Sequence, residues 1–275
     1  MVTNSKNDIK KQSDDTYIQF NENTIDVTID AFHHGNFFLV QPKKVGHRSG
    51  IDAMLLAASV PENFSGLLAD FGSGVGAAGL AVAARCPKAQ ITLIENAPLM
   101  LHCAKKTLTL KKNEKLTNRI TLIDADINLK NTITSQKNIR PNSFDYIIMN
   151  PPFNNPQSNV SQDPLRVKAH VMTQNLFENW ISTAATLLKA KGKVSIIARP
   201  ACLNEILSAM HKRFANIEII PILPTPLDSA IRIIIRAQHN SRAPTTIKPA
   251  IILRQTNDDK LNDKIEKLCN GLMPL

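Results

Sequence analysis

The four residues best suited to chemistry are Asn150, Pro151, Pro152 and Phe153, which follow the apolar run of residues 144–149. Two consecutive prolines fix φ and restrict the preceding residue, so Asn150 is held in an extended geometry. Its side-chain oxygen and the Pro151 carbonyl can together accept both N–H bonds of a planar amino group. Such a nitrogen is a poor nucleophile because its lone pair is delocalised, and two acceptors favour the pyramidal form that attacks. Phe153 offers a ring for stacking on the planar group.

A second motif is the glycine-rich turn of residues 70–79, where an apolar strand is followed by a helix. Glycines let the chain turn sharply and let a ligand approach without meeting a Cβ. Two ligands fit the spacing. The glycines from Gly74 onward match the dinucleotide fingerprint, while an acid followed by alternating glycines resembles the first motif of S-adenosylmethionine-dependent methyltransferases. Glu95, at the end of the next strand, stands where either ligand needs an acceptor for its ribose hydroxyls.

The elements that must position these motifs alternate between strands and helices. Strands are predicted at residues 67–71, 90–95, 119–123, 144–149, 193–198, 217–220 and 231–236. Helices are predicted at residues 50–60, 77–85, 98–112, 174–189 and 201–214, with a charged helix near the C-terminus. This alternation indicates a mostly parallel sheet that is covered on both faces. The predicted fold is therefore α/β and Rossmann-like, with a mostly parallel seven-stranded sheet and an antiparallel C-terminal hairpin.

The N-terminal region differs in character from the rest of the chain. Its first 16 or so residues are polar and aperiodic, and short β-rich runs follow at residues 16–20, 25–29 and 36–40. We therefore expect a flexible tail plus a short β-rich extension over residues 1–45, and one α/β domain over residues 46–275.

Composition excludes several classes of protein. Of the 275 residues 43% are hydrophobic, which is enough for a sizeable core. No apolar run reaches the ~18 residues of a membrane helix, and the polar N-terminus lacks the hydrophobic stretch of a secretory signal. The four cysteines form no CxxC pair, so we expect neither zinc nor another metal, and no disulfide framework. The sequence predicts a cytoplasmic protein, and a monomer is favoured.

The charge balance favours a polyanionic partner. Lys and Arg number 33 against 23 Asp and Glu, a formal net charge of +10, which by itself does not choose between nucleic acid and a membrane surface. Basic residues beside the two motifs favour tRNA or another structured RNA. The residues predicted to bind its phosphates are Lys43, Lys44, Arg48, Arg166 and Lys168.

Taken together, the glycine turn, Glu95, Asp126 and the tetrad of residues 150–153 resemble the Rossmann-type amino-methyltransferases with an (N/D)PP(Y/F) motif. The resemblance implies S-adenosyl-L-methionine as cofactor and S-adenosyl-L-homocysteine as product. It also implies that Asp126, or Asp124 in its place, accepts from the adenine amino group of the cofactor; an ordinary turn acid is the alternative. The cofactor-binding residues expected on this basis are Asp52, Asp70, Gly72, Ser73, Gly74, Gly76, Glu95, Asn96, Asp126 and Asn150.

The upstream segment, residues 41–58, narrows the family. Its Gly-x-Asp-x-x-Leu-Leu pattern resembles the element before the first motif in bacterial tRNA(Val) adenine-N6-methyltransferases, and the resemblance covers roughly residues 36–236. It implies that Asp52 approaches the methionine end of the cofactor; a plain acid at a helix N-terminus is the alternative. The chain departs from the family at two positions. Ile51 stands where the family often has Thr, and Phe153 stands where it often has Tyr.

Several other functions share part of this pattern. Glutamine-N5 methyltransferases of release factors usually carry a Tyr tetrad and a helical N-terminal domain. Ribosomal-RNA guanine-N2 methyltransferases commonly have His after the Phe and a second domain copy, whereas Asn154 follows here. An NAD(P)-dependent oxidoreductase leaves the tetrad unexplained, and a non-catalytic RNA-binding module requires a decayed cofactor turn. The sequence therefore predicts methyl transfer to the exocyclic amino group of adenine in tRNA.

Overall fold

The structure is a computed structural model that describes residues 25–43, 49–129, 133–135, 139–152, 175–255 and 261–275. The strands are β1 Val27–Phe32, β2 Phe37–Pro42, β3 Gly66–Phe71, β4 Ala89–Glu95, β5 Ile120–Asp124, β6 Phe144–Met149, β7 Leu188–Ala198, β8 Phe214–Leu223, β9 Arg232–His239, β10 Thr246–Ile247 and β11 Ile251–Ile252. The helices are η1 His33–Gly35, α1 Ile51–Ala58, α2 Ala77–Arg85, α3 Pro98–Thr109, η2 Lys111–Asn113, α4 Glu114–Thr117, α7 Leu176–Leu187, η3 Pro200–Cys202, α8 Leu203–Met210 and α9 Asp263–Cys269.

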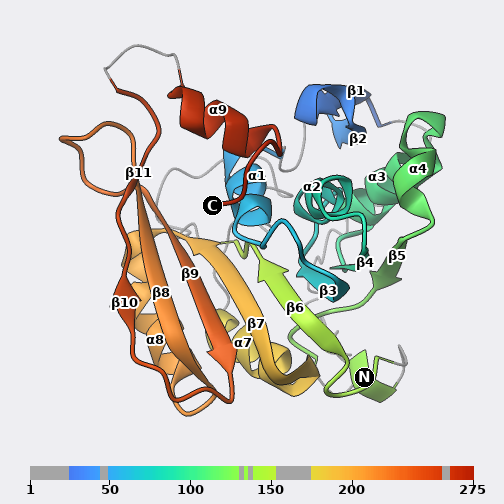
Figure 1. The fold of residues 1–275 in the computed structure, drawn as a ribbon. Coiled ribbons are helices and arrows are strands. Elements are labelled where there is room, and N and C mark those ends of the chain that lie inside the picture. The colour runs from blue at the N-terminus through green and yellow to red at the C-terminus, as the bar shows by residue number, and fades with distance from the viewer. Residues whose placement is uncertain (1–24, 44–48, 130–132, 136–138, 153–174, 256–260) are drawn as a thin grey trace, which may run out of the picture.

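The main sheet has the order β10-β8-β9-β7-β6-β3-β4-β5, and β11 also pairs with β8 (Figure 1). Strands β3 to β7 pair in parallel, and β9 is antiparallel to both β7 and β8. The α/β class, the mostly parallel sheet and the antiparallel hairpin are thus confirmed. The sheet has nine strands instead of seven, because two-residue strands in the Pro-rich connection, Thr246–Ile247 and Ile251–Ile252, add to β8. Segments this short carry no periodic pattern.

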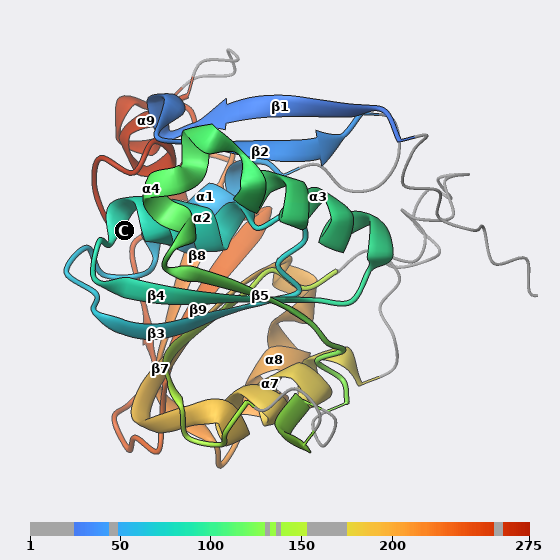
Figure 2. The ribbon, with the colours of Figure 1, turned by 90° about the vertical axis from the view of Figure 1, so that its right-hand side faces the viewer.

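Helices cover the sheet on both faces, as predicted (Figure 2). Helices α1, α2 and α3 lie on one face, where α9 and the hairpin β1–β2 join the same hydrophobic cluster. Helices α7 and α8 pack on the other face around a second cluster. Each face of the sheet therefore has its own apolar layer, as continuous apolar strands require.

Most element boundaries shift by a few residues from the sequence prediction, and two differences have a clear cause. Strand β7 begins at Leu188 directly after α7, and its pairing with β6 shifts register by a bulge before Lys193. The helix predicted at residues 201–214 is shorter, because Lys212 adopts a positive φ of 63° and the chain turns into β8. The strand predicted at residues 16–20 lies outside the described residues.

The hairpin β1–β2 is joined to the α/β part by buried polar contacts. Val40 N–H donates to Thr107 Oγ1 at 2.9 Å. The Asn113 side chain accepts from Phe38 N–H at 2.9 Å and donates to the carbonyls of Phe38 and Thr107, both at 2.8 Å. Leu39 and Val40 belong to the main cluster, so the described part of the N-terminal extension shares the core of the α/β part. The domain boundary near residue 45 stays a prediction.

The four cysteines are free thiols, and three of them are buried. Among the residues that the structure describes, no helix is long and apolar enough to cross a membrane, and no group of His, Cys, Asp and Glu is arranged to hold a metal ion.

Replacing Asn113, which is fully buried, with alanine will destabilise the fold. Asn113→Ala removes one acceptor and two donated hydrogen bonds and leaves the N–H and carbonyl of Phe38 without this partner, while the Thr107 carbonyl keeps the Leu110 N–H. We therefore expect a loss of about 2–4 kcal/mol in urea unfolding. The matched control is Asn118→Ala at an exposed turn position, which should change stability by less than about 0.5 kcal/mol. Equal midpoints for the two variants would contradict this role of Asn113.

Candidate active site

Neighbouring strands end at the same level and bring the two sequence motifs together. In the sheet register Phe71 of β3 lies beside Met149 of β6 and Ile94 of β4. The next residues of β3 and β6, Gly72 and Asn150, therefore leave the sheet beside Glu95, the last residue of β4. This is the C-terminal edge of parallel strands, where open α/β sheets bind their ligands.

The glycine turn uses the left-handed backbone conformation that only glycine adopts readily. Gly72, Gly74 and Gly76 have φ values of 62°, 58° and 94°. A Cβ built on Gly74 meets no heavy atom within 4 Å, whereas one on Gly72 lies 2.5 Å from Cη2 of Trp180. The backbone is thus closely packed at Gly72 and open at Gly74, which is where a ligand can approach it.

The Glu95 carboxylate connects two turns. Its Oε2 accepts from Gly74 N–H at 2.7 Å, and its Oε1 accepts from the N–H groups of Asn96 and Ala97 at 2.9 and 2.8 Å. A carboxylate offers about four lone-pair sites, so a further acceptor site remains for hydroxyl donors. Glu95 therefore holds the glycine turn against the start of α3 and keeps the capacity to accept from a ribose.

Asp70, at the end of β3, is a buried acid in the same region. Its side chain is 2% exposed, and its Oδ2 accepts from Gly79 N–H at 2.8 Å. Burial raises the pKa of Asp70 to about 7, the Gly79 hydrogen bond opposes this rise, and the neighbouring Glu95 adds to it. The Ser73 hydroxyl of the same turn is buried, with no hydrogen-bond partner in the described part of the chain.

Two other predicted cofactor residues have protein partners. Asp126 Oδ1 accepts from the backbone N–H and from Nδ2 of Asn128, both at 2.9 Å, in an Asx turn after β5. Asp52 Oδ2, in the first turn of α1, pairs with Arg232 Nε at 2.8 Å. The Asp126 contact matches an ordinary turn acid, whereas Asp52 lies in the first turn of its helix and also forms an ion pair that was not expected. The roles of both acids toward the cofactor stay predictions.

The described part of the tetrad begins directly after β6. Asn150 is half-buried and Pro151 is buried. Among the described residues nothing hydrogen-bonds to the Asn150 amide, so its oxygen is available as an acceptor.

Of the remaining site residues, Lys43 is exposed and its Nζ lies 3.4 Å from Asp26 Oδ2. The others lie outside the described residues: Lys44, Arg48, Phe153, Arg166 and Lys168.

Sequence reasoning missed Trp180 and Arg199. Trp180, on the buried face of α7, packs edge-on against Phe71 at a centroid distance of 6.5 Å, and its benzo edge abuts Gly72. Its Nε1 is buried without a hydrogen-bond partner in the part of the chain that the structure describes. Arg199 follows β7 at the same edge of the sheet as Asn150. The available signals were the single Trp of the chain and a basic residue before Pro at a strand end.

Comparison with known proteins decides the family. The family model for the methyltransferase small domain matches residues 47–222, more than half of the chain. The chain belongs to the methyltransferase small domain family. This membership decides between the two interpretations of the glycine turn in favour of the methyltransferase motif.

One solved structure agrees with that assignment, and a more distant one shares the fold. A solved structure of a predicted O-methyltransferase from Agrobacterium tumefaciens is 33% identical, with a TM-score of 0.70 over 82% of this chain and 98% of that chain. An S-adenosylmethionine-dependent O-methyltransferase of Thermotoga maritima shares the fold, with a TM-score of 0.50 and 18% identity over 73% of this chain and 69% of that chain.

Curated relatives from two strains of Porphyromonas gingivalis are both named tRNA1(Val) (adenine(37)-N6)-methyltransferase. They are 29% identical over 157 residues, which cover 54% of this chain and 58% of each relative. The match thus spans less than two thirds of the length of these relatives.

The family uses S-adenosylmethionine as methyl donor, and the site fits that cofactor. The open backbone at Gly74 leaves room for a ligand, and the buried Ser73 hydroxyl has no protein partner among the described residues. Glu95 can accept from ribose hydroxyls, and the carboxylates of Glu95 and Asp70 complement a positively charged ligand. Each of these groups was predicted from the sequence.

Alanine substitution should lower stability more at Gly72 than at Gly74, because only Gly72 is closely packed. Both substitutions strain a left-handed residue by about 1–2 kcal/mol. Gly72→Ala also overpacks against the buried Trp180 ring and should lose about 1–3 kcal/mol more in urea unfolding. Trp180→Phe, which removes the contacting atom, should reduce this extra loss in a double-mutant cycle. Additive effects of the two changes would contradict the contact.

The protonation of Asp70 should make stability depend on pH. Its pKa is raised from 3.8 in the unfolded chain to about 7 in the fold, so between these values unfolding releases a proton. Stability contributed by this group therefore falls as pH rises from about 4 to about 7, by at most about 1.4 kcal/mol per pH unit. Asp70→Asn keeps an acceptor for Gly79 and removes this slope. Urea unfolding at pH 5, 6, 7 and 8 measures it; a constant difference between wild type and variant would refute the assignment.

Proposed function

We propose that this methyltransferase transfers a methyl group from S-adenosylmethionine to the exocyclic amino group of an adenine in tRNA. The observation that carries the proposal is the Asn150 amide, half-buried and without a hydrogen-bond partner among the described residues, beside the glycine turn. The name of the Porphyromonas gingivalis relatives supports adenine in tRNA as the acceptor.

The cofactor is assigned to the edge formed by β3, β4 and β6. When bound, S-adenosylmethionine supplies an activated methyl group on a positively charged sulfur. Glu95 would accept from the ribose hydroxyls, and Ser73 would donate or accept a further hydrogen bond. Asp70 adds a negative charge to the site when it ionises, which is the sign that a cationic ligand requires. Asp126 would accept from the adenine of the cofactor through the oxygen that the Asn128 contacts leave available.

The acceptor nitrogen is activated by hydrogen bonding in this proposal. Asn150 Oδ1 accepts one N–H of the adenine amino group and the Pro151 carbonyl accepts the other. Both bonds strengthen as the nitrogen becomes pyramidal and positive, so they favour the transition state more than the ground state. After transfer the proton leaves to water, and no protein base is required. Phe153, outside the described residues, would stack on the target base.

Two acceptors explain why an amino group is favoured over a hydroxyl. The Agrobacterium tumefaciens relative is described as a predicted O-methyltransferase, which would methylate an oxygen. A hydroxyl has one O–H to donate, so it would leave either Asn150 or Pro151 without a donor. Guanine-N2 and glutamine-N5 also present two N–H bonds and remain the alternative acceptors.

The partner in this proposal is tRNA or another structured RNA, in agreement with the formal net charge of +10. Of the predicted phosphate-binding residues, Lys43 already shares its charge with Asp26. Cytoplasmic location and a monomeric state stay predictions.

Asn150→Ala should lower turnover on unmodified tRNA by about 10²–10³, because one acceptor of the amino group is lost in the transition state. Cofactor affinity should change far less, and Asn150→Asp, which keeps an acceptor oxygen, should retain more activity than alanine. Titration calorimetry measures the affinity, and mass spectrometry of nucleosides measures the product, expected to be N6-methyladenosine.

The same assay contains the outcomes that contradict the proposal. A methylguanosine or a methylated ribose hydroxyl as product would replace adenine as the acceptor. Wild-type turnover in Asn150→Ala would remove Asn150 from the chemistry.

A further inference from the structure

One surface of the protein is unusually rich in unpaired positive charge. Helix α3 and the two short helices after it, η2 and α4, carry exposed lysines that we call the lysine surface: Lys105, Lys106, Lys111, Lys112 and Lys115. Residues 98–119 contain six basic residues and a single acid, Glu114. The sixth basic residue, Arg119, donates instead to backbone carbonyls of the protein.

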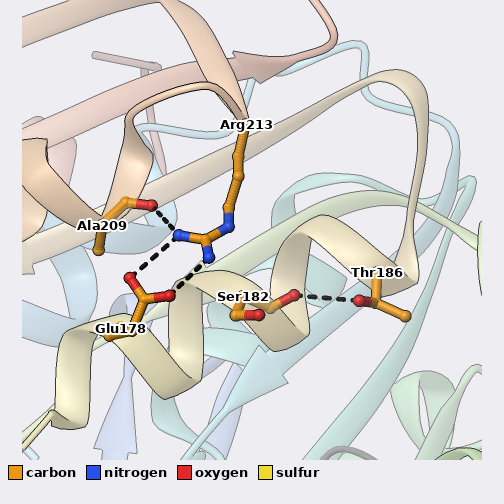
Figure 3. A network of polar contacts seen from close by, with 5 residues as sticks. All are labelled: Glu178, Ser182, Thr186, Ala209 and Arg213. Carbon is orange, nitrogen blue, oxygen red and sulfur yellow. Dashed lines mark hydrogen bonds and ion pairs between the residues drawn. The ribbon is translucent and has the colours of Figure 1, made fainter.

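The lysines of this surface have no acidic partners among the described residues. Within that part of the chain none of the five forms an ion pair. Several basic residues elsewhere are neutralised, as Figure 3 shows for Arg213, which binds Glu178 through two nitrogens at 3.0 and 2.5 Å. Arg236 and Lys248 pair in the same way with Glu218, at 2.7 and 2.9 Å. The lysine surface therefore carries a positive potential that nearby described acids do not cancel.

The lysine surface is also held rigidly. Buried contacts of Asn113 and Thr107 join α3 and η2 to the hairpin β1–β2. Lys112 Nζ lies 4.4 Å above the ring centroid of Phe38, a cation–π contact that orients this side chain. Charges in a fixed arrangement bind a fixed arrangement of phosphates with a smaller loss of entropy than freely moving ones.

The position of the surface relative to the active site suits a large substrate. Helix α3 begins at Pro98, three residues after Glu95, and its 12 residues extend about 18 Å. Figure 2 shows α3 and α4 on one side of the molecule, next to the hairpin and the edge strand β5. Lys105 and Lys106 thus lie more than half a helix length from the methyl-transfer edge, and Lys111, Lys112 and Lys115 lie about a full helix length from it. A single nucleotide does not span that distance, whereas a folded RNA does.

We propose that the lysine surface binds the phosphate backbone of the substrate RNA at a distance from the methylated base. The inference rests on the proposed function, which supplies the RNA, and it adds a binding surface that the motifs do not indicate. An anionic membrane is the less favoured partner, because membrane-binding surfaces combine lysines with apolar side chains. The large exposed apolar residues among the described ones lie outside α3, η2 and α4.

Charge reversal tests the surface against a matched control. Lys111→Glu/Lys115→Glu changes the net charge by −4 on the lysine surface. Lys264→Glu/Lys267→Glu makes the same change on α9, on exposed residues of another helix. Fluorescence anisotropy with an unmodified tRNA(Val) transcript at about 0.1 M salt measures affinity. We expect the Kd to rise at least tenfold for the first pair and less than threefold for the second.

Salt dependence and kinetics add independent readouts. Each lost phosphate contact should reduce the slope of log K against log salt by about 0.7–0.9. The KM for tRNA should rise while kcat, S-adenosylmethionine affinity and thermal stability stay at wild-type values. Affinity for a short single-stranded oligonucleotide should be unchanged, since it does not reach the lysine surface.

The results that overturn the inference are distinct from those that overturn the proposed function. If wild-type protein binds and methylates tRNA but both double variants bind equally, the lysine surface has no specific role and the proposed function stands. Binding of the wild type to phosphatidylserine vesicles, lost in Lys111→Glu/Lys115→Glu while tRNA binding is kept, would assign the surface to a membrane. If the wild type binds no RNA at any salt concentration, both proposals fail.

Discussion

A single carboxylate, that of Glu95, holds together the two turns that form the cofactor edge. It accepts from one N–H group of the glycine turn and from two at the start of α3. These donors have no strand or helix partner, and hydrogen bonds to an ionised acceptor are about twice as strong as neutral ones. One side chain can reach both turns only because β3 and β4 end at the same level, with Phe71 beside Ile94. The geometry of the site therefore depends on strand register.

Asp70, the second acid at the cofactor edge, supplies negative charge to the site at a cost in stability. Asp70 is almost fully buried, and desolvation opposes its ionisation although Gly79 N–H donates to it. An apolar side chain at this position would avoid that cost. Two neighbouring carboxylates repel each other and attract a cation, which agrees with the positive charge on the sulfur of S-adenosylmethionine. Strongly perturbed acids of this kind cluster at functional sites.

Charge is distributed unevenly over the rest of the molecule. Acids lie at the cofactor edge, and elsewhere Glu178 of α7 and Glu218 of β8 pair with the basic residues Arg213, Arg236 and Lys248. The lysines of α3, η2 and α4 have no such partners among the described residues and lie on the side of the hairpin β1–β2 (Figure 2). A small cationic cofactor and a large anionic substrate would thus meet opposite potentials on different parts of the molecule. The hairpin, through Asn113, fixes the relative position of the lysines.

Much of the fold was predictable from the sequence, because the relevant signals are local. The helix at residues 77–85 and the strand at residues 144–149 have the predicted bounds, since a proline, a glycine turn or a polar stretch marks their ends. The positions of the glycine turn, Glu95 and Asn150 at strand ends follow from the same alternation of apolar runs. Their shared location at one edge then follows from the parallel order of α/β sheets.

The tertiary structure alone decided the features that join distant segments. Trp180 lies 108 positions after Gly72, and no periodic pattern indicates that its ring abuts that glycine. The two short strands beside β8 exist through pairing, without a signal of their own. The sequence determined the net charge of +10, but ion pairing depends on which side chains face each other after folding. For that reason the sequence predicted an anionic partner, whereas only the structure decided which of the described lysines are left without an ion pair.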